Sequence, residues 1–506
     1  MITLLKPPST DNYWKNGVMP YQVASLKGYL SRECDITIDD LEIKVWMFNR
    51  LNLNNGIDLS YYSYRNVLSH LLKKPDEMIE EYSRKIIRLI NNLKNPVIAF
   101  YVENSEELLV VLTIGQILKK MGKSVVLVGA FFQTISCALM KKYDFIDYIV
   151  FDSGELSLEY LLKNKDPKAV PNLSYRLNKR VLLSQCSDII SQNLIPMPDF
   201  SGLPFDLYKK YNSQHFGFSS LVLPYRLSQG CGRDCFFCGL PKYNYFNVQK
   251  PVKAVSELKA LTKKYKTSKV FFYDNSITFS NSYLKLFCDQ ILKNKLKIRY
   301  VAFAHYSDLK PNDLLKLRKT GCLALCFGVE SVSVPSIVNL KKNKNLHTIS
   351  DVLKNCKKAG VWTHIFVMCG LFDQTLGHLK KDLLFIKKNI ENIDSILINQ
   401  FQLLIGSDIY KNPGRYGINK VSYTLAPYSR SLPFLPVNRK ATSQYNYYFK
   451  AIGRLRIPNF EPDRCLSFLF NESRKGLMID LMKKRPVLGS EGFLKLCREA
   501  HEQDRT

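Results

Sequence analysis

Short apolar segments alternate with helical segments along most of this chain, and this alternation constrains the fold most strongly. The apolar segments of the first part are residues 3–6, 34–39, 96–102, 123–129 and 146–151. Helical patterns separate them, as in Val23–Leu30 and the segment 105–121. Strands that alternate with helices pair in parallel and are covered on both faces. We therefore predict a doubly wound, Rossmann-like α/β domain over residues 1–165.

The same alternation returns in the second part of the chain. Its predicted strands are residues 221–227, 269–274, 298–304, 323–328, 362–368 and 395–404. Six β/α steps predict a partial (β/α)6 barrel of the TIM type over residues 221–410, with functional side chains just past the strand ends. The proline-rich stretch 166–220 is predicted to be a linker. Residues 411–506 are predicted to form a mostly helical and loop-rich cap that binds substrate.

Three cysteines lie directly after the first strand of the second part, in the spacing Cys231-x3-Cys235-x2-Cys238. Three thiolates on one tight loop can hold three irons of a 4Fe-4S cluster and leave the fourth iron open. Structural zinc sites and electron-transfer clusters instead use four ligands. The nearest further candidates do not have ligand-pair spacing: His215, Cys186 and Cys288. A zinc knuckle completed by a distant histidine, or three buried thiols, remain the alternatives.

The triplet, with Phe237 directly before its last cysteine, resembles the signature of the radical S-adenosylmethionine (radical SAM) superfamily. The resemblance implies an enzyme in which the amino and carboxylate groups of S-adenosylmethionine (SAM) chelate the open iron. An electron from the cluster then cleaves the sulfonium and yields a 5'-deoxyadenosyl radical. An electron donor such as a flavodoxin or ferredoxin is implied as a partner.

The first domain resembles the cobalamin-binding-like domain that precedes many radical SAM domains. The matching segments are Leu4-Leu-Lys-Pro-Pro, residues 20–30 and Phe151-Asp-Ser-Gly-Glu with the helix after it. It departs from that family where Val128-Gly-Ala-Phe-Phe replaces a Gly-Gly-Pro-His segment, and where no Asp-x-His-x-x-Gly occurs. The resemblance leaves two alternatives, cobalamin held without a lower histidine ligand or an empty scaffold.

Further site residues follow from the resemblance at the strand ends. Asp274 and Asn275 are predicted to bind the methionyl amine, although the family's Gly-Gly-Glu is absent there. Gly328-Val-Glu330-Ser331 resembles the Gly-Ile-Glu-Ser pattern, so Glu330 is predicted to bind the ribose or amine of SAM, with a capping role as the alternative. The full set of predicted cofactor-binding residues is Phe237, Gly239, Asp274, Asn275, Glu330 and Ser331.

Cys369 ends the fifth strand, where a thiol can donate a hydrogen atom to a substrate radical, as in radical SAM peptide epimerases. The alternative is a packed small side chain. The two cysteines Cys322 and Cys326 lie on one face of a strand and are predicted to be core thiols. His305 and His364 are also predicted to be core residues rather than ligands.

Composition limits the setting of the protein. The 13 cysteines, without an export signal, indicate reduced thiols or a metal cluster in a cytoplasmic protein, and no segment is apolar enough to span a membrane. The 73 Lys and Arg against 44 Asp and Glu give a net charge of +29. This charge either attracts a polyanionic partner or reflects a compositional bias.

The leading prediction is cobalamin-dependent C-methylation, or a similar modification, of a peptide or natural-product substrate. A radical SAM peptide epimerase that uses Cys369 is the first alternative. A tRNA methylthiotransferase is disfavoured because Cys34 and Cys137 do not supply the three cysteines expected in its first domain. The alternative outside enzymes is a zinc-stabilised nucleic-acid-binding protein.

Overall fold

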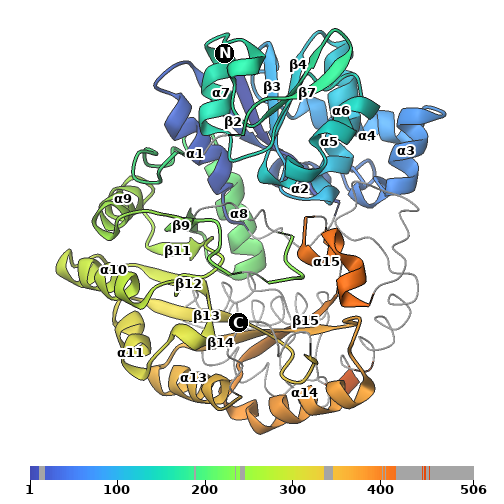
Figure 1. Cartoon of the computed structure of the whole chain (residues 1–506). Helices are drawn as coiled ribbons and strands as arrows, with labels where there is room; N and C mark the ends of the chain where they lie inside the picture. Colours follow the sequence, from blue (N-terminus) through green and yellow to red (C-terminus); the bar gives the residue numbers. More distant parts are fainter. Residues whose placement is uncertain are drawn as a thin grey trace.

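The computed structural model describes two parallel sheets, each with its own helices, stacked end to end (Figure 1). The residues described are 1–10, 17–186, 190–233, 235–239, 246–335, 346–401, 403–404, 406–417, and 447, 450, 451 and 455. The first sheet has the strand order β2-β1-β3-β4-β5-β6-β7, and the second has the order β15-β14-β13-β12-β11-β8. The predicted pair of parallel α/β domains is therefore confirmed.

The first domain contains strands and helices at the predicted places. Its parallel strands are β1 (Ile2–Lys6), β2 (Ile36–Asp40), β3 (Val97–Tyr101), β4 (Ser124–Val128) and β5 (Tyr148–Val150). Its helices are α1 (Tyr21–Leu30), α2 (Leu41–Leu51), α3 (Tyr64–Leu72), α4 (Glu77–Arg88), α5 (Ser105–Lys120), α6 (Ser136–Lys142) and α7 (Glu155–Leu162).

Alternate residues of these strands enter two different cores, because successive side chains of a strand point to opposite faces. Leu4 and Val126 pack with α1 and α7, whereas Leu5 and Leu127 pack with α2 to α6. The core on the α1 side continues without a break into the second domain. This continuity fixes the two sheets against each other.

The structure differs from the prediction in the segment 166–220. Strands β6 (Leu173–Leu177) and β7 (Arg180–Leu183) extend the first sheet as an antiparallel hairpin. Asn178 and Lys179 form its turn with φ of 48° and 64°. A two-residue turn of this kind normally contains glycine, so its sequence signal is weak here. Helix α8 (Phe205–Phe216) also lies in the segment that was predicted to be a linker.

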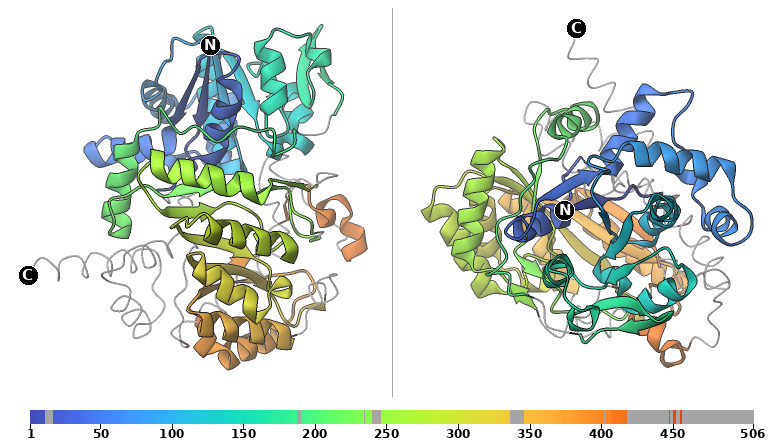
Figure 2. Two further views of the ribbon diagram at one scale, coloured as in Figure 1. Left: turned by 90° about the vertical axis from the view of Figure 1, so that its left-hand side faces the viewer. Right: turned by 90° about the horizontal axis from the view of Figure 1, so that it is seen from above.

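The six predicted strands of the second domain form one parallel sheet. They are β8 (Leu223–Tyr225), β11 (Lys269–Phe272), β12 (Arg299–Ala304), β13 (Cys322–Glu330), β14 (Trp362–Cys369) and β15 (Ser395–Gln400). Strands β9 (Ser228–Gln229) and β10 (Asn247–Val248) form a separate antiparallel pair. The helices are α9 (Pro251–Lys264), α10 (Asn281–Lys293), α11 (Pro311–Lys319), α13 (Leu346–Ala359), α14 (Leu376–Lys388) and α15 (Asp408–Lys411). Helices α9 to α14 cover the outer side of the sheet (Figure 2).

Helix α8 lies between the two domains and connects them (Figure 1). Tyr208 of α8 donates a hydrogen bond to Asp40, whose carboxylate also caps the first turn of α2. Trp46 of α2 packs edge-on against Tyr211, with ring centroids 5.0 Å apart. Val18 and Val222 form a further backbone bridge between the domains. These contacts hold the carboxyl ends of the first sheet above the second domain.

Most of the predicted cap over residues 411–506 lies outside the described residues. The described part of it includes the end of α15 and a 3-10 turn at Pro413–Tyr416. A search of the described helices finds none with the length and apolar character needed to cross a lipid bilayer.

Candidate active site

A cavity of about 590 Å³ lies between the two domains. The first domain contributes residues at its strand ends: Lys6, Asp40, Val102, Glu103, Asn104, Ala130 and Ser153. The second domain contributes Arg226, Ser228, Gln229, Gly230, Cys238, Gly239, Tyr273, Asp274 and Asn275. Ligands of parallel α/β folds bind at the carboxyl ends of the strands. The cavity therefore lies where both domains place their functional edges.

The cysteine loop leaves β9 at this cavity. Cys231 is exposed, and Cys235 and Cys238 are partly exposed. The Cys238 N–H donates to the Cys235 carbonyl at 3.1 Å, so the last two cysteines share a tight turn. Among the described residues, no three potential ligands surround a single metal ion.

Aromatic side chains anchor this loop to the end of the second sheet. Phe236 is buried and stacks on Tyr416, with ring centroids 5.3 Å apart. Phe237, the predicted cofactor contact, packs edge-on against Phe236. Gly239, also predicted to bind cofactor, lines the cavity. The sequence analysis did not single out Phe236, since an aromatic residue inside a cysteine loop gives no sign of its distant partner.

Asp274 and Asn275 hold the cysteine loop by its backbone. The Asp274 carboxylate accepts hydrogen bonds from the Leu227 and Ser228 N–H groups and from the Ser228 hydroxyl, at 2.6–3.1 Å. The Asn275 amide donates to the Gly230 carbonyl at 3.0 Å. Burial raises the Asp274 pKa to about 6, against the opposing effect of these hydrogen bonds. Both residues line the cavity, and their binding of the methionyl amine stays a prediction.

Replacing Asp274 with asparagine should loosen the cysteine loop. The asparagine amide keeps one acceptor oxygen but turns an N–H₂ group toward backbone N–H donors. Leaving such buried groups without a hydrogen bond costs roughly 1–3 kcal/mol. We expect reconstituted iron to be lost to a chelator about tenfold faster than from the wild type. Anaerobic chelation kinetics measure this rate. Asp289→Asn, which removes a half-exposed ion pair with Lys316, is the matched control, and equal rates for both variants would contradict the positioning role.

Glu330 and Ser331 lie at the end of β13, where the backbone leaves the sheet. Glu330 adopts a left-handed φ of 62°, which is uncommon for a residue with a side chain. The Ser331 hydroxyl donates to Asp382 of α14 at 2.7 Å. Neither residue is among those that line the cavity. Ser331 therefore locks the strand end to α14, and ligand binding by Glu330 stays a prediction.

Cys369 is buried, and its thiol donates to the Asn399 carbonyl at 3.5 Å. Burial raises the pKa of this thiol to about 12. Cys369 is not among the cavity-lining residues, and its role as a hydrogen-atom donor stays a prediction. His364 and Cys322 are core residues, as predicted. The His364 ring contacts the Ser395 hydroxyl at 2.8 Å, and burial lowers its pKa to about 3.

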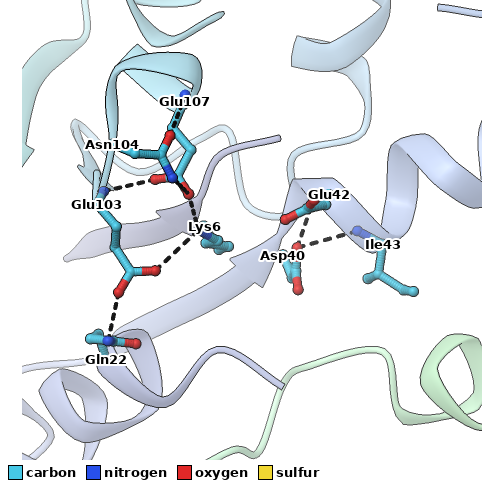
Figure 3. Close-up of polar contacts among 8 residues, drawn as sticks. All are labelled: Lys6, Gln22, Asp40, Glu42, Ile43, Glu103, Asn104 and Glu107. Carbon is cyan, nitrogen blue, oxygen red and sulfur yellow. Dashed lines mark hydrogen bonds and ion pairs between the residues drawn. The ribbon is translucent and has the colours of Figure 1, made fainter. Parts of the chain in front are cut away.

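Charged side chains form a network on the first-domain side of the cavity (Figure 3). Lys6, at the end of β1, forms ion pairs with Glu107 and with Glu103, the latter at 3.4 Å. Burial alone would lower the Lys6 pKa, but the surrounding carboxylates outweigh it and hold that pKa well above its usual value. Gln22 of α1 donates to Glu103 at 2.6 Å. The sequence analysis missed this network because its members are about a hundred residues apart.

Comparison with known proteins agrees with this arrangement. Residues 225–386 match the sequence family described as the Radical SAM superfamily. An uncharacterized methyltransferase of Pyrococcus horikoshii is 25% identical over 342 residues, which cover 66% of this chain and 73% of the relative. The matched residues 225–386 contain the cysteine spacing that predicted this class of enzyme domain.

Two solved structures resemble the chain over nearly its whole length. The radical SAM methyltransferase TsrM of Kitasatospora setae, with cobalamin and a [4Fe-4S] cluster bound, has a TM-score of 0.63 at 13% identity. That match covers 96% of this chain and 98% of TsrM. The cobalamin-dependent SAM radical enzyme OxsB, with aqua-cobalamin bound, has a TM-score of 0.65 at 13% identity and covers 95% of this chain and 72% of OxsB. The fold of this chain is therefore that of cobalamin-dependent radical SAM enzymes.

Proposed function

We propose that this protein is a cobalamin-dependent radical SAM methyltransferase. The observation that carries the proposal is the single cavity shared by the cysteine loop and the strand ends of the first domain. A methyl group that moves between SAM, cobalamin and a substrate requires the three to lie close together. One cavity bounded by both domains meets that requirement.

The residues present fit both groups. Cys231, Cys235 and Cys238 are the thiolates that would hold the 4Fe-4S cluster, which supplies the electron for SAM cleavage. A corrin ring carries carboxamide groups around its edge, and Glu103 offers a partly exposed carboxylate acceptor at the cavity. No histidine is among the described residues that line the cavity.

The chain's own residues would position these groups. Asp274 and Asn275 fix the backbone that leads to the cysteines. The buried Lys6–Glu107 pair supports the first-domain side of the cavity. Glu107 also accepts a hydrogen bond from the Glu103 N–H at 2.8 Å, which ties the pair to the backbone turn at Glu103 and Asn104. Rigid support of this kind limits the reorganisation that a reaction would otherwise require. We propose a peptide or a smaller natural product as the substrate class.

Filling the cavity tests the proposal. Ala130 lines the cavity at the end of β4, and Ala130→Trp places a large ring where the corrinoid would bind. We expect this variant to keep its iron after anaerobic reconstitution but to lose most of the corrinoid that co-purifies on gel filtration. S-adenosylhomocysteine formation, the mark of methyl transfer, should fall with the corrinoid.

Ala138→Trp is the matched control, because Ala138 lies exposed on α6 of the same domain. This variant should bind corrinoid as the wild type does. If Ala130→Trp binds as much corrinoid as Ala138→Trp, the cavity is not the cobalamin site. A wild-type protein that carries iron but never binds corrinoid would contradict the methyltransferase proposal as a whole.

A further inference from the structure

Arg226 lies in the cavity directly after β8, where the two domains meet. Its guanidinium carbon is 5.3 Å from the centre of the Tyr21 ring, which α1 of the first domain contributes. Tyr21 in turn packs edge-on against Tyr225. The Tyr21 ring, itself packed against Tyr225, therefore positions the Arg226 guanidinium at the cavity wall.

This guanidinium has no hydrogen bond or ion pair within the described part of the chain, and its Nε is shielded from solvent. The carboxylates that interact electrostatically with it include Glu155 and Asp274. The oxygens of Asp274 already accept the hydrogen bonds of Leu227 and Ser228. The guanidinium therefore interacts electrostatically with carboxylates, but among the described residues no oxygen accepts a hydrogen bond from its five N–H groups.

Arginine stays protonated in proteins, so Arg226 cannot become neutral by losing its proton. The Arg226 side chain is only partly exposed, and drawing a charge partly out of water without a hydrogen-bonded partner is unfavourable, so such groups are normally paired. From the open cavity beside it, we infer that Arg226 receives its partner from a ligand and forms a carboxylate-binding subsite. A planar carboxylate accepts two parallel hydrogen bonds from a guanidinium, which is the strongest pairing available to it.

Ser153 supports the inference independently. It follows β5, lines the same cavity and is only 6% exposed. Its hydroxyl has no hydrogen-bond partner among the described residues. Buried hydroxyls are normally satisfied, so a second unsatisfied donor on this wall again indicates a ligand with acceptor oxygens.

The carboxylate has two chemical sources, and the inference rests on the proposed function for both. One source is the methionyl carboxylate of SAM. The other is the carboxylate of an amino-acid-like substrate. The second is favoured because the radical SAM resemblance places the SAM carboxylate on the open iron of the cysteine loop. The TsrM structure with a SAM analogue has tryptophan, a carboxylate-bearing molecule, as its substrate.

Binding measurements on the reconstituted protein test the subsite with two pairs of probes. S-adenosylhomocysteine carries the methionyl carboxylate, and 5'-methylthioadenosine lacks it. The twenty L-amino acids are screened by calorimetry, and the tightest binder is compared with its carboxamide. Arg226→Gln should weaken binding of the carboxylate member of one pair by about 10- to 100-fold and leave binding of its neutral member unchanged. Arg226→Lys should recover part of the loss, because lysine keeps the charge without the fork.

The pair that responds identifies the source of the carboxylate. Arg32→Gln is the control, because Arg32 also lies over a tyrosine ring, that of Tyr29, but is not among the cavity-lining residues. The inference is wrong if Arg226→Gln and Arg32→Gln bind every probe equally, or if no carboxylate probe binds better than its neutral partner. Iron and corrinoid are quantified in the same samples, so a wild-type protein without corrinoid counts against the proposed function and leaves the arginine comparison valid.

Discussion

Replacing any one of Cys231, Cys235 and Cys238 with alanine should abolish SAM cleavage, with a loss of at least about 10³-fold. Each thiolate is expected to bind its own iron, so two thiolates leave a cluster that decays on purification. Anaerobic iron and sulfide analysis, together with mass-spectrometric detection of 5'-deoxyadenosine and S-adenosylhomocysteine, measures the effect. Cys238 lines the cavity, and no cysteine outside the triplet is among the described residues that line it.

Cys186→Ala is the matched control for this series. Cys186 is exposed, as Cys231 is, but lies in the segment before α8, outside the cysteine loop. It should retain iron and activity. A triplet variant with wild-type iron content would contradict the cluster assignment, and about one zinc per chain without iron or sulfide would favour the nucleic-acid-binding alternative.

Replacing Lys6 with methionine should lower the free energy of unfolding by about 3–5 kcal/mol. Methionine has a similar length, but it leaves the Glu107 carboxylate buried without its cation. Removing one partner of a buried pair is strongly destabilising because the remaining charge has neither water nor a counter-ion. Urea unfolding followed by circular dichroism measures the change.

The double variant Lys6→Met/Glu107→Gln removes both charges and should recover most of the stability. Corrinoid binding should fall in the single variant and return partly in the double variant, because the network lies on the cavity wall (Figure 3). Lys163→Met, which breaks an exposed pair with Glu159, should change stability little. A single variant as stable as Lys163→Met would show that the buried pair does not support the first domain.

Local sequence patterns predicted most of the fold, since the strands of both sheets are buried on both faces and appear as continuous apolar runs. The hairpin of β6 and β7 was not predicted, because its turn residues, Asn178 and Lys179, lack the glycine that marks such turns. The cluster ligands could be predicted from spacing alone, because all three lie within eight residues of one another.

The rest of the site depends on contacts between distant parts of the chain. Lys6 meets Glu107 only because β1 and β3 are neighbours in the sheet. Arg226 lines the cavity between the domains and lies over the ring of Tyr21, about two hundred residues earlier in the chain. Cys369 and Ser331 follow two other predicted strand ends, where both are buried and form hydrogen bonds with Asn399 and Asp382. Strand ends predict a site's edge, and only tertiary packing decides which side chains face it.

In the proposed function, the cluster and cobalamin share one cavity between the two domains. The most direct measurement is the amount of corrinoid and of iron bound to the same anaerobically reconstituted chain, after removal of free cofactors and with Ala130→Trp in parallel. The proposed function predicts near-stoichiometric corrinoid together with a 4Fe-4S cluster in the wild type, and the cluster alone in Ala130→Trp. Iron without corrinoid in the wild type, or equal corrinoid in both proteins, would contradict it.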